Sequence, residues 1–402
     1  MVPHKPNVTL ILFQAPMHKR EVILAPRKAL FDALEAQFSL TILPSQDFTD
    51  QEAARDDTVF FPFIASGGSE EVLLHFGPSR LPGPFLVLFD NRYNSLAASL
   101  EIATYLTQGK RETPLIKSLE SLTWEDVCLY GAMQRAARYM RRANVSIWGE
   151  PSSWLIASAV DYKAISALLG TRFQQFPVET LQNLFVAQHT ANQDEETKAQ
   201  TMCRCLSQLL QETQSNALTI RCFELLQATG VSACLALAQL NAQGTVAACE
   251  GDVPALLTMM MVRGLTQQSS FMCNPSHIAP DAQTVRLAHC TAPLDFVPSY
   301  VLDTHFESGK SVAIRAQFAP DEPYTLVKWA GNKLERFFTT EAVSVSQPYS
   351  ATECRTQLQL RCDAPLSAYT TLGMGNHVVV VKGRYSHLFT CWNQHLTYLR
   401  QR

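Results

Sequence analysis

The chain has 402 residues, of which 47% are hydrophobic and 17% charged, and its formal net charge is −3. This composition is apolar enough to fold and argues against an intrinsically disordered chain. The small net charge gives no general attraction to nucleic acid or to an anionic membrane, so we expect neither as a partner. Because domains usually have about 100–200 residues, the length predicts two or three of them.

The cysteines and the first residues bear on the compartment. The count of eleven cysteines is odd, and no two are spaced as CxxC. Most lie in or beside apolar runs, which predicts buried free thiols in a reducing compartment. The start has only a short apolar run before Gln14 and lacks the features of a signal peptide. The longest apolar patch, 255–262, is far shorter than the ~18–20 residues of a membrane span. We therefore expect a soluble, cytoplasmic protein.

Residues 1–120 alternate short apolar runs with helical patterns. Four runs rich in Val, Ile, Leu and Phe predict buried strands: VTLILF, LTIL, VFFPFI and PFLVLF. Helical patterns at 26–37 and 96–108 lie between or after them. This rhythm predicts a doubly wound parallel sheet, in which ligands bind beyond the carboxyl ends of the strands.

A second α/β unit is predicted from the helix at 124–142 and the strand VSIWG. Helices are expected near 155–169, 178–190 and 194–214, and LTIRCF is either a strand or the start of a helix. Residues 225–240 predict one buried helix, TVAAC a strand that ends before Glu250, and 253–265 a further helix.

After about residue 270 the segments become short, alternating and rich in turns. VRLAHCTA, SVAIRAQF, YTLVKWA, CRTQLQLRC and HVVVVKG all have strand patterns. They predict a mostly β, barrel-like C-terminal domain. The predicted domains are thus an N-terminal α/β domain (1–120), a central α/β domain (121–270) and a β-rich domain (271–402).

Several common catalytic motifs are missing. The sequence contains no P-loop, HExxH, GxSxG or paired-cysteine zinc pattern, and GMGN at 373–376 lacks the third glycine of a dinucleotide fingerprint. The most informative segment is ACEGDVPA (248–255), because a strand there delivers Glu250 to the edge where ligand sites form. An acidic cap on the following helix is the alternative for this segment, and Asp252 is the better candidate for the cap.

Three histidines stand beside strand patterns. His289 lies within RLAHCTAPL, His305 within THFESG, and His377 between a glycine turn and the run VVVV. Each is compatible with a structural role, although the position of His377 favours a pocket. A glutamate with two histidines suits a divalent ion of intermediate hardness such as Mn²⁺.

A set of segments in one order resembles the superfamily of L-fucose isomerase and L-arabinose isomerase, especially its shorter fucose isomerase-like members. The similar segments are ASGGSEEVLL (65–74), DNRYNSLAASLEIATYLTQG (90–109), IWGEPSSWLIASAVD (147–161), LTIRCFELL (218–226), ACEGDVPALLTMMMVRGLT (248–266), RLAHCTAP (286–293), THFESG (304–309) and GMGNHVVVVKG (373–383).

This resemblance implies two α/β domains, a β-rich C-terminal domain and a site for Mn²⁺ or a similar divalent cation. By position, the implied metal ligands are Glu250, Asn274, His289 and His377, with Glu250 and Asn274 as the catalytic pair. The implied reaction interconverts aldoses and ketoses through a cis-enediol, with one carboxylate moving the carbon proton and another the hydroxyl proton.

Asn274 departs from the family pattern, which has an acid at that position. Its amide oxygen can bind a cation, but it cannot act as a base near neutral pH. Three alternatives therefore stay open: a slow sugar isomerase that uses water or a neighbouring group, a related one-base epimerase, and a sugar-binding homologue without turnover.

The resemblance also suggests residues for binding substrate. Arg221, His305, Asn376 and Trp154 are the candidates, although Arg221 is equally suited to an ordinary salt bridge and Trp154 to a core position. The implied partner is a sugar or sugar derivative, and the implied assembly is a homo-oligomer, a trimer or hexamer.

Overall fold

The computed structural model describes residues 5–108, 115–190, 192–279, 282–346 and 349–400. Two compact units are present, one formed by 1–139 with 391–402 and the other by 140–390. The three domains expected from the sequence divide the chain differently, and their boundaries stay a prediction. We describe each unit by itself.

The first unit is built on a five-stranded parallel sheet in the order β2-β1-β3-β4-β5. All seven residues of β3 are buried, so both faces of this strand are covered, as expected for a parallel sheet between helices. The strands are β1 (Asn7–Phe13), β2 (Ser39–Pro44), β3 (Thr58–Ile64), β4 (Leu86–Phe89) and β5 (Leu115–Ser118). The helices are α1 (Arg20–Leu24), α2 (Lys28–Gln37), α3 (Asp50–Ala53), α4 (Ser69–Phe76), α5 (Ser95–Gln108) and α6 (Trp124–Arg142).

The second unit begins with a four-stranded parallel sheet in the order β7-β6-β8-β9. Its strands are β6 (Asn144–Trp148), β7 (Arg172–Phe176), β8 (Ala217–Ile220) and β9 (Val246–Ala248). The helices of this part are α7 (Tyr162–Leu169), α8 (Val178–Gln188), α9 (Glu195–Glu212), α10 (Cys222–Thr229), α11 (Cys234–Ala242) and α12 (Val253–Thr266).

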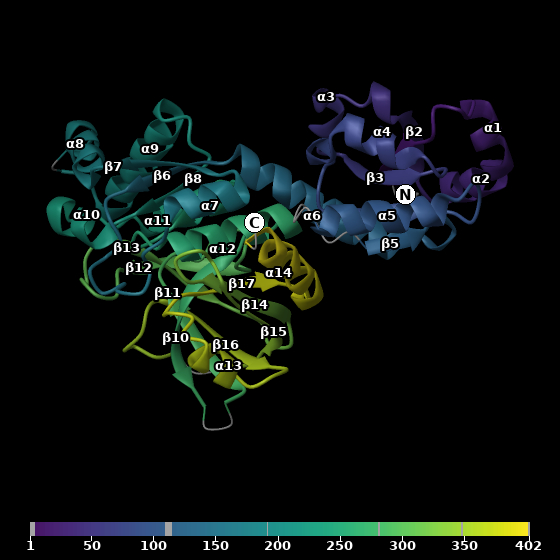
Figure 1. The fold of residues 1–402 in the computed structure, drawn as a ribbon. Coiled ribbons are helices and arrows are strands. Elements are labelled where there is room, and N and C mark those ends of the chain that lie inside the picture. The colour runs from purple at the N-terminus through teal and green to yellow at the C-terminus, as the bar shows by residue number, and fades with distance from the viewer. Residues whose placement is uncertain (1–4, 109–114, 191, 280–281, 347–348, 401–402) are drawn as a thin grey trace. The chain divides into compact units, whose positions relative to one another are not determined.

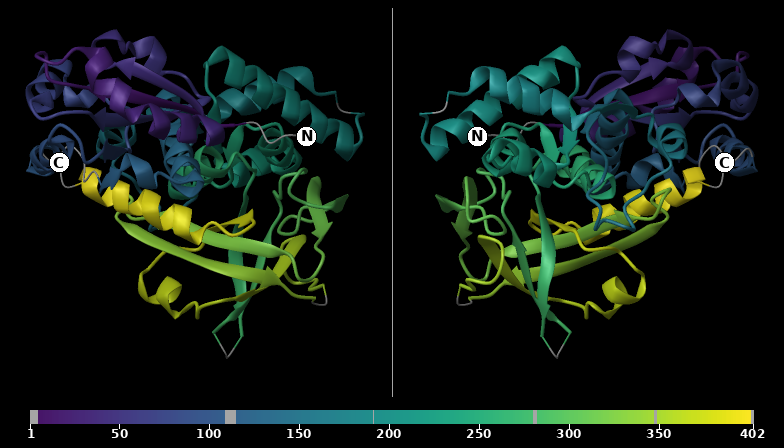
Figure 2. Two further views of the ribbon diagram at one scale, coloured as in Figure 1. Left: turned by 90° about the vertical axis from the view of Figure 1, so that its right-hand side faces the viewer. Right: turned by 90° about the vertical axis from the view of Figure 1, so that its left-hand side faces the viewer.

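A closed antiparallel barrel follows, in the order β10-β11-β16-β15-β14-β17. It is drawn in green to yellow in Figure 2. The barrel strands are β10 (Phe271–Ile278), β11 (Thr284–His289), β14 (Pro323–Ala330), β15 (Arg336–Ser344), β16 (Thr356–Cys362) and β17 (Val378–Lys382). Outside it lie the ribbon of β12 (Ser299–Thr304) and β13 (Val312–Gln317) and the helix α13 (Ser367–Thr371). Helix α14 (Ser386–Arg400) belongs to this unit as far as Thr390 and to the first unit from Cys391.

Helix α12 joins the second sheet to the barrel. It packs against β8 and β9 on one side and against β10, β14 and β17 on the other (Figure 1). Its residues are almost all buried, which explains why the segment is apolar on every face. The predicted fold class, two parallel α/β sheets followed by a β-barrel, is confirmed. Because α12 touches both layers, its N-terminus brings residues of the sheet and of the barrel together.

Two predicted helices are shorter than expected. The single helix expected at 225–240 is two helices, α10 and α11, because Gly230 ends the first in the left-handed conformation with φ of 73°. The helix expected from 155 begins only at Tyr162, since Asp161 caps it by accepting a hydrogen bond from the Ala164 amide.

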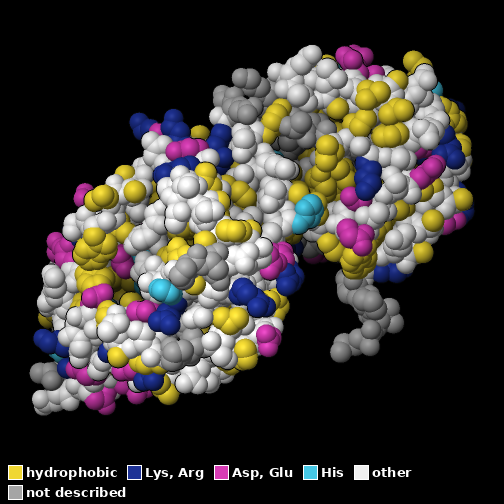
Figure 3. Space-filling view, turned by 90° about the horizontal axis from the view of Figure 1, so that it is seen from below, with side chains coloured by type: hydrophobic (Ala, Val, Ile, Leu, Met, Phe, Trp, Pro, Cys, Tyr) yellow, Lys and Arg dark blue, Asp and Glu magenta, His cyan; other side chains and the backbone are white. Residues whose placement is uncertain are grey.

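Other expectations from composition agree with the structure. All eleven cysteines are free thiols, and most of them are buried. Within the described ranges, no helix has both the length and the apolar character that crossing a membrane requires. On the face drawn in Figure 3, basic and acidic side chains are interspersed, in keeping with the small net charge.

Candidate metal centre

Glu250 lies in a tight turn between β9 and α12. Its backbone has φ of 61°, a left-handed conformation that residues other than glycine adopt rarely. A Cβ on Gly251 would lie 2.8 Å from the Glu150 carbonyl oxygen, so glycine is required for this close approach. The Ser152 amide donates to the Glu250 carbonyl at 2.9 Å. The turn therefore fixes both Glu250 and the 150–152 segment at the carboxyl edge of the sheet.

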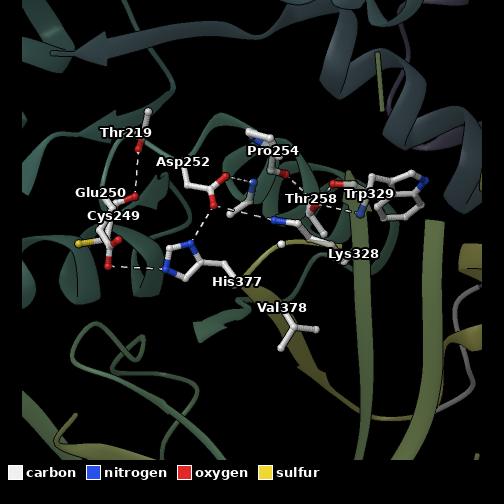
Figure 4. A network of polar contacts seen from close by, with 12 residues as sticks. Thr219, Cys249, Glu250, Asp252, Pro254, Thr258, Lys328, Trp329, His377 and Val378 are labelled. Carbon is white, nitrogen blue, oxygen red and sulfur yellow. Dashed lines mark hydrogen bonds and ion pairs between the residues drawn. The ribbon is translucent and has the colours of Figure 1, made fainter. Parts of the chain in front are cut away.

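Two histidines of the barrel face the Glu250 carboxylate. His289 is the last residue of β11, and His377 directly precedes β17. The Oε1 atom of Glu250 lies 3.7 Å from Nε2 of His289 and 3.6 Å from Nε2 of His377, as Figure 4 shows for His377. One ligand atom from each of the three residues lies within 4.8 Å of the others. All three side chains are buried, with exposed fractions of 7%, 4% and 0% for Glu250, His289 and His377.

These separations suit a shared ion better than hydrogen bonds. An N–H···O hydrogen bond is about 2.7–3.2 Å long, so contacts of 3.6 and 3.7 Å are too long. Two ligand atoms that are each about 2.1 Å from one ion, at angles of about 90–120°, lie roughly 3.0–3.7 Å apart. Moreover, Nε2 of His377 is buried and has no hydrogen-bond partner among the described residues. The three residues therefore fit a divalent cation.

Both histidines are oriented through their other ring nitrogen. Nδ1 of His377 lies 2.7 Å from Oδ2 of Asp252, and Nδ1 of His289 lies 2.9 Å from Oγ1 of Thr291. A proton on Nδ1 leaves a lone pair on Nε2, which is the atom that faces Glu250. Such outer partners fix the tautomer and ring orientation of histidines in metal sites.

The second carboxylate oxygen of Glu250 is also engaged. The indole Nε1 of Trp154 donates to Oε2 of Glu250 at 2.7 Å, across 96 residues of sequence. Trp154 is half-exposed rather than a core residue, with 50% of its surface accessible. Because Trp154 holds Oε2, the other oxygen, Oε1, faces the two histidines.

The electrostatics keep both acids of the site ionised. Burial is the largest influence on Glu250 and opposes ionisation, but His289 and His377 outweigh it and hold the pKa of Glu250 well below its usual range. Burial also opposes ionisation of Asp252, yet Lys328 and His377 lower its pKa to about 2. Conversely, burial disfavours the charged form of His377, but Asp252 and Glu250 raise its pKa overall. The site thus presents negative charge that a cation can neutralise.

Asn274 lies on β10 between the segments that carry the two histidines. It pairs with Ala288, the residue before His289, and the preceding Cys273 pairs with Val378, the residue after His377. Its Oδ1 atom is buried and has no hydrogen-bond partner among the described residues. A buried amide oxygen is costly unless it is paired, so this atom also suits a cation or a ligand.

The other candidate residues have different surroundings. Arg221 forms an ion pair with Glu224 at 2.9 Å and is partly exposed. His305 is buried, its Nδ1 lies 3.2 Å from the Ser308 hydroxyl, and its ring contacts Phe223. Asn376 is exposed and lines a small cavity together with Lys328 and Arg336.

Sequence reasoning missed three residues that support the site. Asp252 was expected only as a helix cap, and it does accept from the Ala255 amide at 2.8 Å, but its other oxygen holds His377. Lys328 is buried with its Nζ 4.0 Å from Asp252 (Figure 4), and Thr291 holds His289. Asp252 and Thr291 could have been found from the sequence, because each is a polar residue two positions after a candidate ligand. Lys328 could not, because no candidate ligand lies near it in the sequence.

Comparisons with known proteins point to sugar isomerases. No family model matches the chain. The chain is similar to the sulfoquinovose isomerases of Priestia aryabhattai and Priestia megaterium (strain ATCC 12872 / QMB1551), at 23% identity over 210 residues. Each alignment covers 48% of this chain and 45% of the relative. The chain therefore spans about half the length of the curated relatives it matches, and it has distant similarity to a sugar isomerase.

Proposed function

We propose that the chain is a metal-dependent aldose–ketose isomerase of the L-fucose isomerase and L-arabinose isomerase superfamily. The observation that carries the proposal is the convergence of Glu250, His289 and His377 in a buried group, with both histidines oriented through Nδ1. The distant similarity to sulfoquinovose isomerases supports a sugar as the substrate.

The proposed metal ligands are Glu250, His289, His377 and Asn274. Two imidazoles, a carboxylate and an amide oxygen suit Mn²⁺ or a similar divalent ion of intermediate hardness. When bound, such an ion would supply the positive charge that stabilises an enediolate. Asn274 belongs to the set because its Oδ1 is buried without a partner beside the strands that carry the histidines.

The chain itself orients the proposed metal ligands and provides a partly apolar surface for the substrate. Trp154 holds Glu250, while Asp252 and Thr291 hold the histidines, so the ligand atoms are fixed before any ion binds. The exposed face of Trp154 offers a stacking surface for a sugar ring. Arg221, His305 and Asn376 are the further residues that we propose to bind substrate hydroxyls.

The assembly that we propose follows from the family resemblance, and the location follows from the free cysteines. We propose a homo-oligomer, a trimer or hexamer, in the cytoplasm. Neither nucleic acid nor membrane is proposed as a partner.

Hydrogen exchange at carbon tests the proposal. The protein with Mn²⁺ is incubated in D₂O with sulfoquinovose and with a panel of aldoses and ketoses, and deuterium at C2 and product formation are measured by NMR. We expect exchange and isomerisation of at least one sugar, both lost after chelation. Saturated Mn²⁺ binding without exchange on any sugar would contradict the proposal.

A sugar-binding homologue without turnover, or a one-base epimerase, is the second candidate. Asn274 favours it, because an amide at the position of the second acid cannot exchange protons. The variant Asn274→Asp separates the candidates when it is assayed beside the parent with Mn²⁺. A parent that binds sugar without turnover and a variant that isomerises it would favour the binding-only homologue. Isomerisation by the parent would favour the enzyme, and an inverted stereocentre without aldose–ketose conversion would favour the epimerase.

A further inference from the structure

A cis-enediol isomerisation needs a group that accepts and returns a proton at carbon. Asn274 stands where the resemblance places the second acid, and an amide cannot serve as a base near neutral pH. Another residue must therefore carry this proton if the proposed function is correct. The inference below rests on that proposed function.

The side chains of the candidate metal centre already have other contacts. Both oxygens of Glu250 are used, Oε1 by the histidine pair and Oε2 by Trp154. His289 and His377 use Nδ1 for Thr291 and Asp252 and direct Nε2 to the ion site.

Asp252 and Lys328 lie in the outer layer of the site. Asp252 is 1% exposed and binds His377 and the α12 amide of Ala255, and Lys328 lies against it at 4.0 Å.

His305 is a titratable group that borders Trp154 through the ring of Phe223. It begins the loop between β12 and β13, where its amide donates to the Lys310 carbonyl at 3.1 Å. Its ring packs edge-on against Phe223 at a centroid distance of 5.6 Å, and Phe223 packs against Trp154 at 4.9 Å. Trp154 in turn donates to Glu250. His305 and Glu250 therefore border one aromatic wall that is formed by Trp154 and Phe223.

The loop of His305 is also anchored beside His289. Phe306, the next residue, packs against the buried cluster of Cys234, Cys290 and Ala313. Cys290 directly follows His289, and its carbonyl accepts from the Ile314 amide of β13 at 3.2 Å. The position of His305 relative to the ligand histidine is thus fixed by packing and by strand contacts.

The hydrogen bonds around His305 allow its Nε2 to act as an acceptor. The Ser308 hydroxyl donates to the Lys310 carbonyl at 3.4 Å, so its oxygen is available to accept a proton from Nδ1 of His305 at 3.2 Å. This arrangement leaves a lone pair on Nε2, which has no hydrogen-bond partner among the described residues and is not sealed from solvent. Burial lowers the pKa of His305, which favours the neutral form that a base requires.

We propose that His305 is the proton-transfer residue at carbon, in place of the acid that Asn274 does not provide. In the aldose-to-ketose direction, Nε2 takes the proton from C2 while the C2–H pair forms the C1–C2 double bond and the carbonyl pair moves onto O1. The imidazolium then returns its proton to C1. The hydroxyl proton moves from O2 to O1, so that atoms and charge balance without any further reactant.

The test compares His305→Gln with the wild type in the presence of Mn²⁺. His277→Gln is the matched control, because His277 is exposed on β10. We expect His305→Gln to lower kcat by about 10²–10⁴-fold, with Mn²⁺ affinity by calorimetry unchanged. We also expect free imidazole to restore part of the turnover in His305→Ala, which a purely structural histidine would not allow.

The outcomes separate the role of His305 from the proposed isomerase function. A wild type that turns over, with His305→Gln as active as His277→Gln, overturns the role of His305 alone. Loss of Mn²⁺ affinity in His305→Gln, or absence of rescue by imidazole, likewise makes His305 structural and overturns its role. A wild type that binds Mn²⁺ but turns over no sugar overturns the proposed function, and the role of His305 falls with it.

Discussion

Asp90 and Glu250 are buried carboxylates at equivalent places in the two parallel sheets, yet they are neutralised differently. Asp90 directly follows β4, and the Arg27 guanidinium binds both of its oxygens at 2.7 and 2.8 Å. Glu250 follows β9 by one residue and faces two histidine nitrogens at 3.6 and 3.7 Å.

The comparison shows that a buried carboxylate after a strand of such a sheet can be neutralised by a side chain or left able to bind a cation. A buried charge is costly unless a counter-charge lies close to it. In the first unit Arg27, itself fully buried, carries that charge permanently and also packs against the rings of Phe63 and Tyr93. At Glu250 the partners are histidines, which unlike arginine can lose their proton and present lone pairs to a bound cation.

The largest expected effect is on stability at Asp90. Arg27→Met leaves Asp90 with only the partly exposed Arg92, at 3.2 Å, as a counter-charge, which should lower the free energy of unfolding of the first unit by about 3 kcal/mol. Chemical denaturation followed by circular dichroism measures this. Arg55→Met is the control, because Arg55 forms only surface ion pairs and its loss should cost less than about 1 kcal/mol. Equal stability of the two variants would show that Asp90 does not depend on Arg27.

At Glu250 we expect the opposite behaviour, in which an added ion rather than a side chain stabilises the fold. Free Mn²⁺ at a hundred times its Kd should raise the free energy of unfolding of the wild type by about 2.7 kcal/mol. Glu250→Gln should remove this gain. Glu212→Gln, at an exposed acid of α9, should keep the gain. A gain that persists in Glu250→Gln would place the ion elsewhere.

The outer partner of His377 should have a smaller effect. Asp252→Asn changes the acceptor that orients the ring, and such changes typically lower metal affinity about 10–100-fold. Titration with Mn²⁺ by calorimetry gives the value. Asp161→Asn is the matched control, because Asp161 caps α7 in the way that Asp252 caps α12 but binds no histidine. Equal Mn²⁺ affinity in the two variants would exclude an orienting role for Asp252.

The smallest effect is expected at Trp154. Trp154→Phe removes one hydrogen bond to Glu250 and keeps most of the ring, so the loss should be about 1 kcal/mol, or several-fold in Mn²⁺ affinity. The control Trp124→Phe changes an exposed tryptophan of α6. If both variants bind Mn²⁺ as the wild type does, the bond to Trp154 does not set the position of Glu250.

The sequence predicted the strands of both parallel sheets well where they are continuous runs of Val, Ile, Leu and Phe. VFFPFI and VTLILF are β3 and β1, and TVAAC does end as a strand just before Glu250. Some barrel segments, such as YTLVKWA, were also predicted, whereas β15 was missed although its burial alternates. By contrast, β10 and β12 have no strand pattern in the sequence, because Asn, Pro, Ser or Asp interrupt their apolar runs. They form strands because they pair with neighbours in the barrel or ribbon, which a local pattern does not reveal.

The candidate site was less accessible to sequence reasoning. Glu250 could be placed at a strand end from its local pattern, but its grouping with His289 and His377 came from the family resemblance. Asp252 and His377 are 125 residues apart, and no local pattern shows that the cap of one helix orients a histidine of the barrel. The bond from Trp154 to Glu250 likewise depends on the turn at Gly251, which brings the two segments into contact.

Electron paramagnetic resonance of bound Mn²⁺ tests the central claim most directly. We predict one Mn²⁺ per chain, with couplings to two imidazole nitrogens, of which one disappears in His289→Ala and the other in His377→Ala. Glu250→Gln should greatly weaken binding in the same titration. Absence of saturable binding, or a spectrum without nitrogen couplings that none of the three variants changes, would contradict the assignment of Glu250, His289 and His377 as a metal centre.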